Sequence, residues 1–183
     1  TTTIIEALNY VHGSHVFFSF YKNIATELKN RGVNARTFHS LTYSVVMRSR
    51  GVNNVDSLKM KTLAKEFFEK NNINFKQYGS FCLKLVGLGK NAGIGIAAPN
   101  ARSSWLELVA HHDLSLDEES ADLSQAILIV QSLLDLSNAS KNVDFDDLLY
   151  FAVKDALVLP KFDFVFVDEA QDTNTVQRLI LSK

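Results

Sequence analysis

The chain contains one cysteine, no long apolar run and no excess of charge of either sign. Because Cys82 has no second cysteine to pair with, an internal disulfide is excluded and a reducing compartment is indicated. No apolar stretch is long enough to span a bilayer, and the first residues lack the pattern of a signal peptide, so we expect a soluble, intracellular protein with no membrane partner. The formal net charge of −1 provides no global basic field for nucleic acid, although a local groove can be basic within a neutral protein.

What is present is the composition of an ordinary soluble globular protein. Hydrophobic residues make up 46% of the 183 residues and charged residues 21%, close to the average for such proteins. A chain of this length can bury a substantial core, as one domain or as one domain with an insertion.

The most informative segment is the run FDFVFVDEAQDTN at residues 162–174. Residues 162–167 are almost wholly apolar, β-branched or aromatic, which predicts a strand covered on both faces of a parallel α/β sheet. Asp168 and Glu169, the acidic pair, follow directly, at the end of the strand where such sheets bind their ligands. A carboxylate is costly to desolvate without a cation, and Mg²⁺ with a nucleotide phosphate supplies one. The run therefore indicates phosphoryl chemistry.

Strand and helix patterns alternate at the start of the chain and give way to helical patterns alone in the middle. Such alternation predicts a parallel sheet with right-handed crossovers. We expect an all-helical insertion at residues 45–142, between two parts of one α/β domain at residues 1–44 and 143–183. The strands are predicted at residues 15–20 and 35–38, and the helices at residues 2–11, 23–31, 40–48, 56–70, 77–88, 104–110, 123–136 and 145–157.

Several segments in a fixed order resemble the motifs of one family of DNA motors. DEAQDTN at residues 168–174, with Gln177 beyond it, resembles the Walker B motif of that family. FFSFYKNIA at residues 17–25 resembles motif Ia, and RTFHSL at residues 36–41 resembles motif Ib. DFDDLL at residues 144–149 matches the segment that precedes Walker B. The chain therefore resembles the UvrD/Rep-type superfamily 1 DNA helicases.

This resemblance implies an α/β fold of the P-loop NTPase (RecA-like) type, with an all-helical subdomain inserted into the parallel sheet domain. It implies an ATP-dependent DNA helicase or translocase that uses ATP and Mg²⁺ and binds single-stranded DNA, or DNA with a single-stranded tail. In this interpretation the glycines and lysine of the phosphate loop, and the second motor domain, lie outside the chain. The chain alone is therefore expected to be inactive.

The resemblance also assigns roles around the nucleotide. It implies that Asp168 holds Mg²⁺, that Glu169 orients or deprotonates the attacking water, and that Gln171 senses the γ-phosphate. The alternative is an acidic helix N-terminus, favoured by the helix dipole. Thr1 is placed at the Mg²⁺-binding position of a truncated phosphate loop, with Thr2 beside the nucleotide. Threonines that simply cap a helix are the alternative there.

DNA contacts are implied after two of the predicted strands. Aromatic rings stack on unpaired bases and lysine attracts phosphate, so Tyr21 and Lys22 are the expected ligands after the first strand. For Phe20 a contact with a DNA base and a place in the core are equally open. After the second strand, hydroxyl, imidazole and backbone N–H groups would seat a phosphate, although a helix N-cap explains the same residues and both can hold together. This second contact comprises Thr37, Phe38, His39 and Ser40.

Other polar segments have simpler interpretations. Asp146 and Asp147 could reach the nucleotide, but a solvated helix start is the preferred explanation. Residues 87–91 contain Gly-Lys without the rest of a phosphate loop and predict a flexible turn. The adjacent His111 and His112 have poor spacing for a metal site and predict a surface loop.

Trp105 and Cys82 are expected in the core. Asp172 and Thr173 are expected to form hydrogen bonds that fix the loop after the acidic pair.

Two other functions remain open from the sequence. A non-catalytic DNA-binding or interaction module, descended from such a motor, would carry the same motifs without a phosphate loop. A metal-dependent nuclease would need converging carboxylates for two metal ions, and Asp144, Asp146, Asp168 and Glu169 are the candidates.

Overall fold

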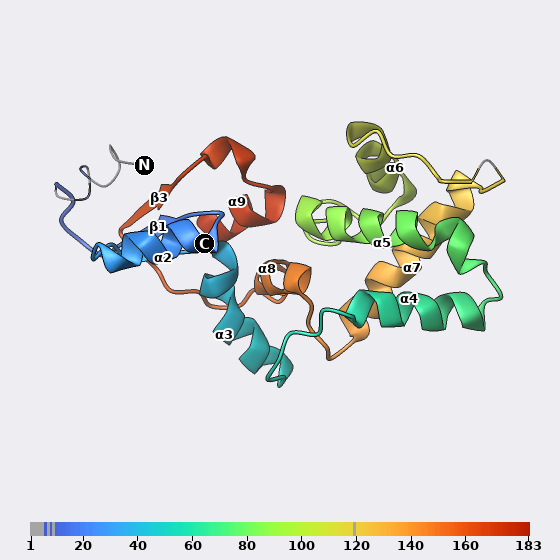
Figure 1. The fold of residues 1–183 in the computed structure, drawn as a ribbon, viewed down its shortest axis with the longest axis horizontal. Coiled ribbons are helices and arrows are strands. Elements are labelled where there is room, and N and C mark those ends of the chain that lie inside the picture. Colours follow the sequence, from blue (N-terminus) through green and yellow to red (C-terminus); the bar gives the residue numbers. More distant parts are fainter. Residues whose placement is uncertain (1–5, 7, 9, 119) are drawn as a thin grey trace.

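The structure is a computed structural model that describes residues 6, 8, 10–118 and 120–183, and a small parallel sheet lies beside a group of helices in it (Figure 1). Strands β1 (His15–Phe18), β2 (Ala35–Arg36) and β3 (Phe164–Val167) form a three-stranded sheet in the order β2-β1-β3. Both strand pairs are parallel. The predicted parallel α/β arrangement is confirmed, whereas the helix predicted for residues 2–11 lies largely outside the described residues.

The residues of β1 alternate between the two faces of the sheet, as side chains of a strand do. Val16 and Phe18 face the larger core. Phe17 packs against α2 (Lys22–Asn30) on the opposite face. β1 is therefore buried on both sides, as the central strand of a parallel sheet should be.

β3 departs from the prediction that the strand before the acidic pair is covered on both faces. Phe164 and Val165 are 43% and 42% exposed, and the rest of the strand is only partly buried. The reason is its position, because β3 lies at an edge of the described sheet and pairs there with β1 alone. The apolar run predicted the strand correctly but not what surrounds it.

Helices make up most of the described chain, and their ends follow ordinary capping rules. α3 (Phe38–Arg50) and α8 (Phe145–Lys154) each begin with a capping box, in which the N-cap residue and the third helical residue exchange hydrogen bonds. Such boxes satisfy N–H groups that the first turn leaves unpaired. The other helices are α4 (Lys59–Lys70), α5 (Phe75–Ala92), α6 (Arg102–His111), α7 (Leu123–Ala139), η1 (Ala170–Asp172) and α9 (Thr175–Leu181).

Helices α4 to α7 form the helical part of the molecule, with no strand among their described residues. α8 contacts α3, α5 and α9, so it lies between the sheet and the helical part (Figure 1). One hydrophobic cluster extends from Val16 in β1 to Trp105 in α6 and makes the core continuous. The described residues between β2 and β3 form helices and no strand, as predicted, and the boundary predicted after residue 44 falls within α3.

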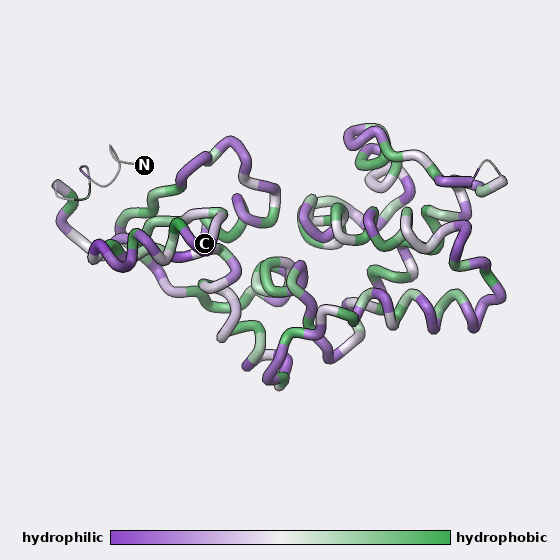
Figure 2. Tube along the Cα trace, viewed as in Figure 1, coloured by the Kyte–Doolittle hydropathy of each residue, from purple (hydrophilic) through white to green (hydrophobic). Residues whose placement is uncertain are grey.

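The hydropathy of the chain follows this arrangement. Figure 2 shows that α8 is largely hydrophobic, while the segment between β3 and α9 is hydrophilic. Trp105 and Cys82 are fully buried, as predicted. Burial raises the pKa of the Cys82 thiol to about 12, which keeps it protonated and unreactive at neutral pH. No helix of the described chain is both long and apolar enough to cross a membrane.

The flexible turn predicted for residues 87–91 is wrong, because this segment lies inside α5. Glycine normally weakens a helix by about 1 kcal/mol relative to alanine. At Gly89 close packing explains it, because a Cβ there would overlap the ring of Trp105. His111 and His112 are exposed as predicted, but His111 is the last residue of α6 rather than part of a loop.

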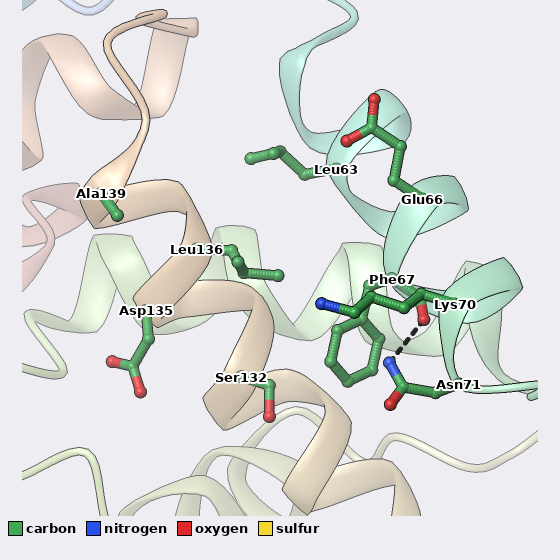
Figure 3. Close-up of a pocket in the computed structure, with 9 residues that line it drawn as sticks. All are labelled: Leu63, Glu66, Phe67, Lys70, Asn71, Ser132, Asp135, Leu136 and Ala139. Carbon is green, nitrogen blue, oxygen red and sulfur yellow. Dashed lines mark hydrogen bonds between the residues drawn. The ribbon is translucent and has the colours of Figure 1, made fainter.

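A groove of about 690 Å³ lies between α4 and α7 (Figure 3). Leu63, Phe67 and Leu136 line it together with polar residues such as Glu66 and Asp135. None of its lining residues belongs to the sheet or to the segment after β3. The groove is therefore separate from the residues that the sequence assigns to a nucleotide.

Candidate functional site

The parallel strands end at one edge of the sheet, and the predicted site residues follow those ends. Residues 20–22 follow β1, residues 37–39 follow β2, and Asp168 follows β3. Parallel strands bring their carboxyl ends to the same edge, which is where such sheets bind ligands. Because β1 is the middle strand, the segment after it lies between the other two.

The acidic pair lies where β3 gives way to η1. The backbone N–H of Asp168 donates to the carbonyl of Phe18 at 3.1 Å, which extends the β1–β3 ladder to the acidic pair. Glu169 is exposed and has a φ of 50°. A non-glycine residue in this left-handed region costs about 1 kcal/mol or more, and such residues cluster at functional sites. Glu169 therefore turns the chain sharply at the strand end.

The structure brings together the two residues that the sequence assigns to catalysis. The Gln171 amide donates from Nε2 to Oε2 of Glu169 at 2.5 Å. Thr173 donates from its hydroxyl to the carbonyl of Ala170 at 2.7 Å, so its predicted hydrogen bond to the backbone is present. Asn174 then caps α9 in a capping box with Gln177. Local hydrogen bonds thus hold the whole loop from Glu169 to Asn174.

Asp168 is a predicted metal ligand that lies among the described residues at this edge. It is half-buried, and carboxylate oxygen is a ligand that Mg²⁺ accepts while it keeps several waters. Its place at a strand end therefore fits a Mg²⁺–nucleotide complex. Thr1 and Thr2, the other predicted ligands, lie outside the described residues.

Tyr21 is an exposed aromatic residue just after β1. Its side chain is 66% exposed, and its backbone N–H donates to the Ser19 hydroxyl oxygen at 3.2 Å, which fixes the turn after the strand. Lys22 is also exposed. Phe20 is partly buried, and its ring centroid lies 6.0 Å from that of Phe38. Tyr21 and Lys22 are therefore accessible to a ligand, whereas Phe20 also contributes to packing.

The segment after β2 is less accessible than its sequence suggested. Phe38 is 2% exposed, and its ring stacks on Phe18 with centroids 4.7 Å apart. Only the backbone of Phe38 is left for a ligand, so the predicted contact through its side chain has no support. Thr37 accepts from the Ser40 N–H at 3.1 Å as the N-cap of α3. Burial lowers the pKa of His39, which favours the neutral imidazole.

Phe145 is a candidate that sequence reasoning missed. It begins α8, is 60% exposed, and lies edge-on to His39 with ring centroids 6.4 Å apart. The available signal was an aromatic residue between aspartates in the first turn of a helix, which is an unfavourable place for a core residue. Phe145 adds an exposed ring beside the segment after β2.

Two of the three aspartates in the DFDDLL segment form buried ion pairs, while Asp146 is half-buried. Asp147 is 0% exposed and lies 2.6 Å from Lys59 Nζ and 2.8 Å from Lys90 Nζ, while Asp144 lies 2.9 Å from Lys90 Nζ. We call Lys59, Lys90, Asp144 and Asp147 the buried charge cluster. The solvated start predicted for Asp147 is wrong, because two lysines from the helical part cover it.

The pKa shifts of the two lysines reflect their different surroundings. Burial lowers the pKa of Lys59, and the charge of Asp147 offsets this in part. Burial also acts to lower the pKa of Lys90, but Asp147 and Asp144 together outweigh it and leave the pKa raised. Lys90 is thus held in its charged form between two carboxylates. Burial, with the nearby charge of Asp144, raises the pKa of Asp146.

This arrangement weighs against the nuclease hypothesis. Asp144 is occupied by Lys90 and by the cap of α8 rather than converging with the acidic pair.

A parallel sheet with an acidic pair at the carboxyl end of one strand, and a helical insertion beside it, is an α/β domain of the class that binds its ligand at this edge of the sheet. A family model described as the UvrD/REP helicase N-terminal domain matches residues 18–183. The chain therefore belongs to the UvrD/Rep helicase family. No curated protein and no solved structure matches it significantly. Membership confirms the resemblance carried by the motifs and indicates a helicase-type function.

Proposed function

We propose that this chain is the part of an ATP-dependent DNA helicase that binds ATP with Mg²⁺ and contacts single-stranded DNA. The observation that supports this best is the shared sheet edge, where the acidic pair after β3 meets the exposed Tyr21 and Lys22 after β1. In this proposal residues 1–44 and 143–183 belong to the first motor domain, residues 45–142 are its helical insertion, and a second motor domain completes the machine.

At the nucleotide, each residue of the acidic run has a distinct task. Asp168 would hold Mg²⁺, which supplies charge neutralisation at the phosphates. Glu169 would orient the attacking water and accept its proton. Gln171 donates to Glu169 in the present structure and could transfer that hydrogen bond to a γ-phosphate, which would report the nucleotide state. Thr1 and Thr2 would complete the site from the phosphate loop.

On the surface proposed to contact DNA, aromatic and neutral side chains outnumber charged ones. Tyr21 offers a ring for base stacking and Lys22 a charge for phosphate. Thr37, His39 and backbone N–H groups at the start of α3 would seat a second phosphate. The exposed ring of Phe145 extends this surface. Stacking on any base and contacts to phosphate are independent of sequence, which suits a motor that moves along DNA.

The direct test is ATP hydrolysis by the intact protein with and without single-stranded DNA. We expect Mg²⁺-dependent turnover that rises when the DNA is added. DNA binding without turnover would favour the non-catalytic module instead. If the protein neither bound DNA nor hydrolysed ATP, both interpretations would be refuted.

Replacing Tyr21 by alanine should weaken binding to single-stranded DNA. Stacking of one base on an aromatic ring contributes about 1–3 kcal/mol, so Kd should rise by roughly 5- to 150-fold. Fluorescence anisotropy with a labelled oligonucleotide measures this. Tyr10→Ala is the matched control, because Tyr10 is 84% exposed but precedes the opposite end of β1. Equal affinities for the Tyr21 variant and the unaltered protein would remove Tyr21 from the DNA surface.

A further inference from the structure

A hydrogen bond joins the helical part directly to the loop that follows the acidic pair. Asn174 Nδ2 donates to Oδ1 of Asn91 at 2.9 Å, and both side chains are half-buried. Asn91 lies in the last turn of α5. The bond runs beside a groove of about 540 Å³ that α5, α6 and the start of α9 form together. Neither asparagine is among the residues proposed to touch ATP or DNA.

The amide of Asn91 is held in one orientation. Its Nδ2 donates to the carbonyl of Gly87 at 2.9 Å and lies 3.4 Å from Oδ1 of Asp146. With its N–H groups directed at these acceptors, its oxygen must face Asn174. The acceptor that receives the Asn174 amide is therefore preorganised by α5 and α8.

The end of α5 that carries Asn91 is also fixed to α8. The preceding residue, Lys90, pairs with Asp144 and Asp147 in the buried charge cluster. Lys59 of α4 pairs with Asp147 as well and donates to the carbonyl of Ser137 in α7. Separating α5 from α8 would leave buried charges without partners, which is strongly unfavourable. Asn91 is consequently a firm point of attachment.

The loop with the acidic pair is thus attached at both ends. At its start, the Asp168 N–H bonds to the carbonyl of Phe18 in β1. At its end, Asn174 bonds to Asn91. Between them, short hydrogen bonds link Glu169 to Gln171 and Ala170 to Thr173. A shift of the helical part relative to the sheet would therefore move the two residues proposed to act on the γ-phosphate.

We propose that Asn91 is a positioning residue for ATP hydrolysis, which aligns Glu169 and Gln171 by holding Asn174 against the helical part. This inference rests on the proposed function. Asn91 touches no reactant and acts through the loop alone. Through this bond the orientation of the helical part controls the rate of hydrolysis without altering the affinity for ATP.

The test is the steady-state kinetics of the intact helicase with saturating single-stranded DNA. Asn91→Ala should lower kcat by about five- to tenfold, the change that one lost hydrogen bond produces, and leave KM for ATP unchanged. Asn174 caps α9 through Oδ1 but reaches Asn91 through Nδ2. Serine is a good N-cap with a shorter reach. Asn174→Ser should therefore lower kcat equally, and the double variant should show no further loss.

Asn100→Ala is the matched control for a merely structural effect. Asn100 accepts from the Trp105 indole N–H at 2.7 Å and donates to Asp135 at 3.1 Å, all within the helical part. Its loss should lower Tm and leave kcat unchanged. Normal kcat in both Asn91→Ala and Asn174→Ser, or an equal kcat loss in Asn100→Ala, would overturn the inference while the proposed function stands. If the unaltered protein did not hydrolyse ATP, both the inference and the proposed function would be overturned.

Discussion

Replacing Glu169 by glutamine is expected to abolish ATP turnover by the intact protein while ATP still binds. The amide keeps the size of the side chain and its place next to Gln171, but it cannot accept a proton from the attacking water. General base catalysis typically contributes 10²- to 10⁴-fold, so kcat should fall by about that factor. Steady-state hydrolysis with saturating single-stranded DNA, together with a nucleotide-binding titration, measures both quantities.

Asp163→Asn is a suitable control for the charge change. Asp163 lies just before the start of β3, at the opposite end from Glu169, and accepts from the Ser14 N–H and hydroxyl at 2.8 Å. The substitution removes one negative charge at the other end of the same strand and should leave turnover near normal. Undiminished turnover in Glu169→Gln would refute the role assigned to Glu169.

Replacing Asp147 by alanine should destabilise the chain more than any other single loss of a carboxylate considered above. Removing one partner of a buried ion pair typically costs about 3–5 kcal/mol, because the other charge remains buried and uncompensated. Here Lys59 would lose its carboxylate and Lys90 would keep only Asp144. Denaturant-induced unfolding, followed by circular dichroism, measures the loss.

An exposed ion pair of the same length provides the comparison. Arg31 and Glu27 lie 2.6 Å apart, as Lys59 and Asp147 do, but both side chains are mostly exposed. Exposed pairs contribute about 0–1 kcal/mol, so Glu27→Ala should shift the unfolding midpoint little. Similar losses for Glu27→Ala and Asp147→Ala would contradict the account of the buried charge cluster.

The sequence predicted the sheet and the order of helices well because both depend on local patterns. β-branched and aromatic runs at β1 and β3, and helical spacing in α4 to α7, are signals that a short window carries. The common edge of the predicted site followed from parallel topology alone. The exposure of β3 did not follow from the sequence, because an apolar run does not reveal which elements pack on the two faces of the strand.

The buried charge cluster was beyond sequence reasoning for a different reason. Residues 87–91, which contain Lys90 beside glycines, predicted a flexible turn, and lysine is rarely buried. Its partners Asp144 and Asp147 come from a helix far along the chain, and only the packing of α5 against α8 brings them together. The same packing places Asn91 beside Asn174. Such contacts leave no periodic trace in the sequence.

The surface proposed for DNA was predicted in part. Tyr21 and Lys22 are exposed where the motif placed them, but Phe38 packs on Phe18 in the core. A motif specifies which residues occur together and does not specify which side of the backbone each faces. Phe145 was overlooked because its aspartate neighbours suggested only a helix start.

The most direct test of the proposed nucleotide site is a structure of the intact protein with Mg²⁺ and a non-hydrolysable ATP analogue. We expect Mg²⁺ within reach of Asp168, directly or through one water, and the γ-phosphate facing Glu169 and Gln171. A nucleotide bound elsewhere, with Asp168 and Glu169 facing only solvent, would contradict this expectation.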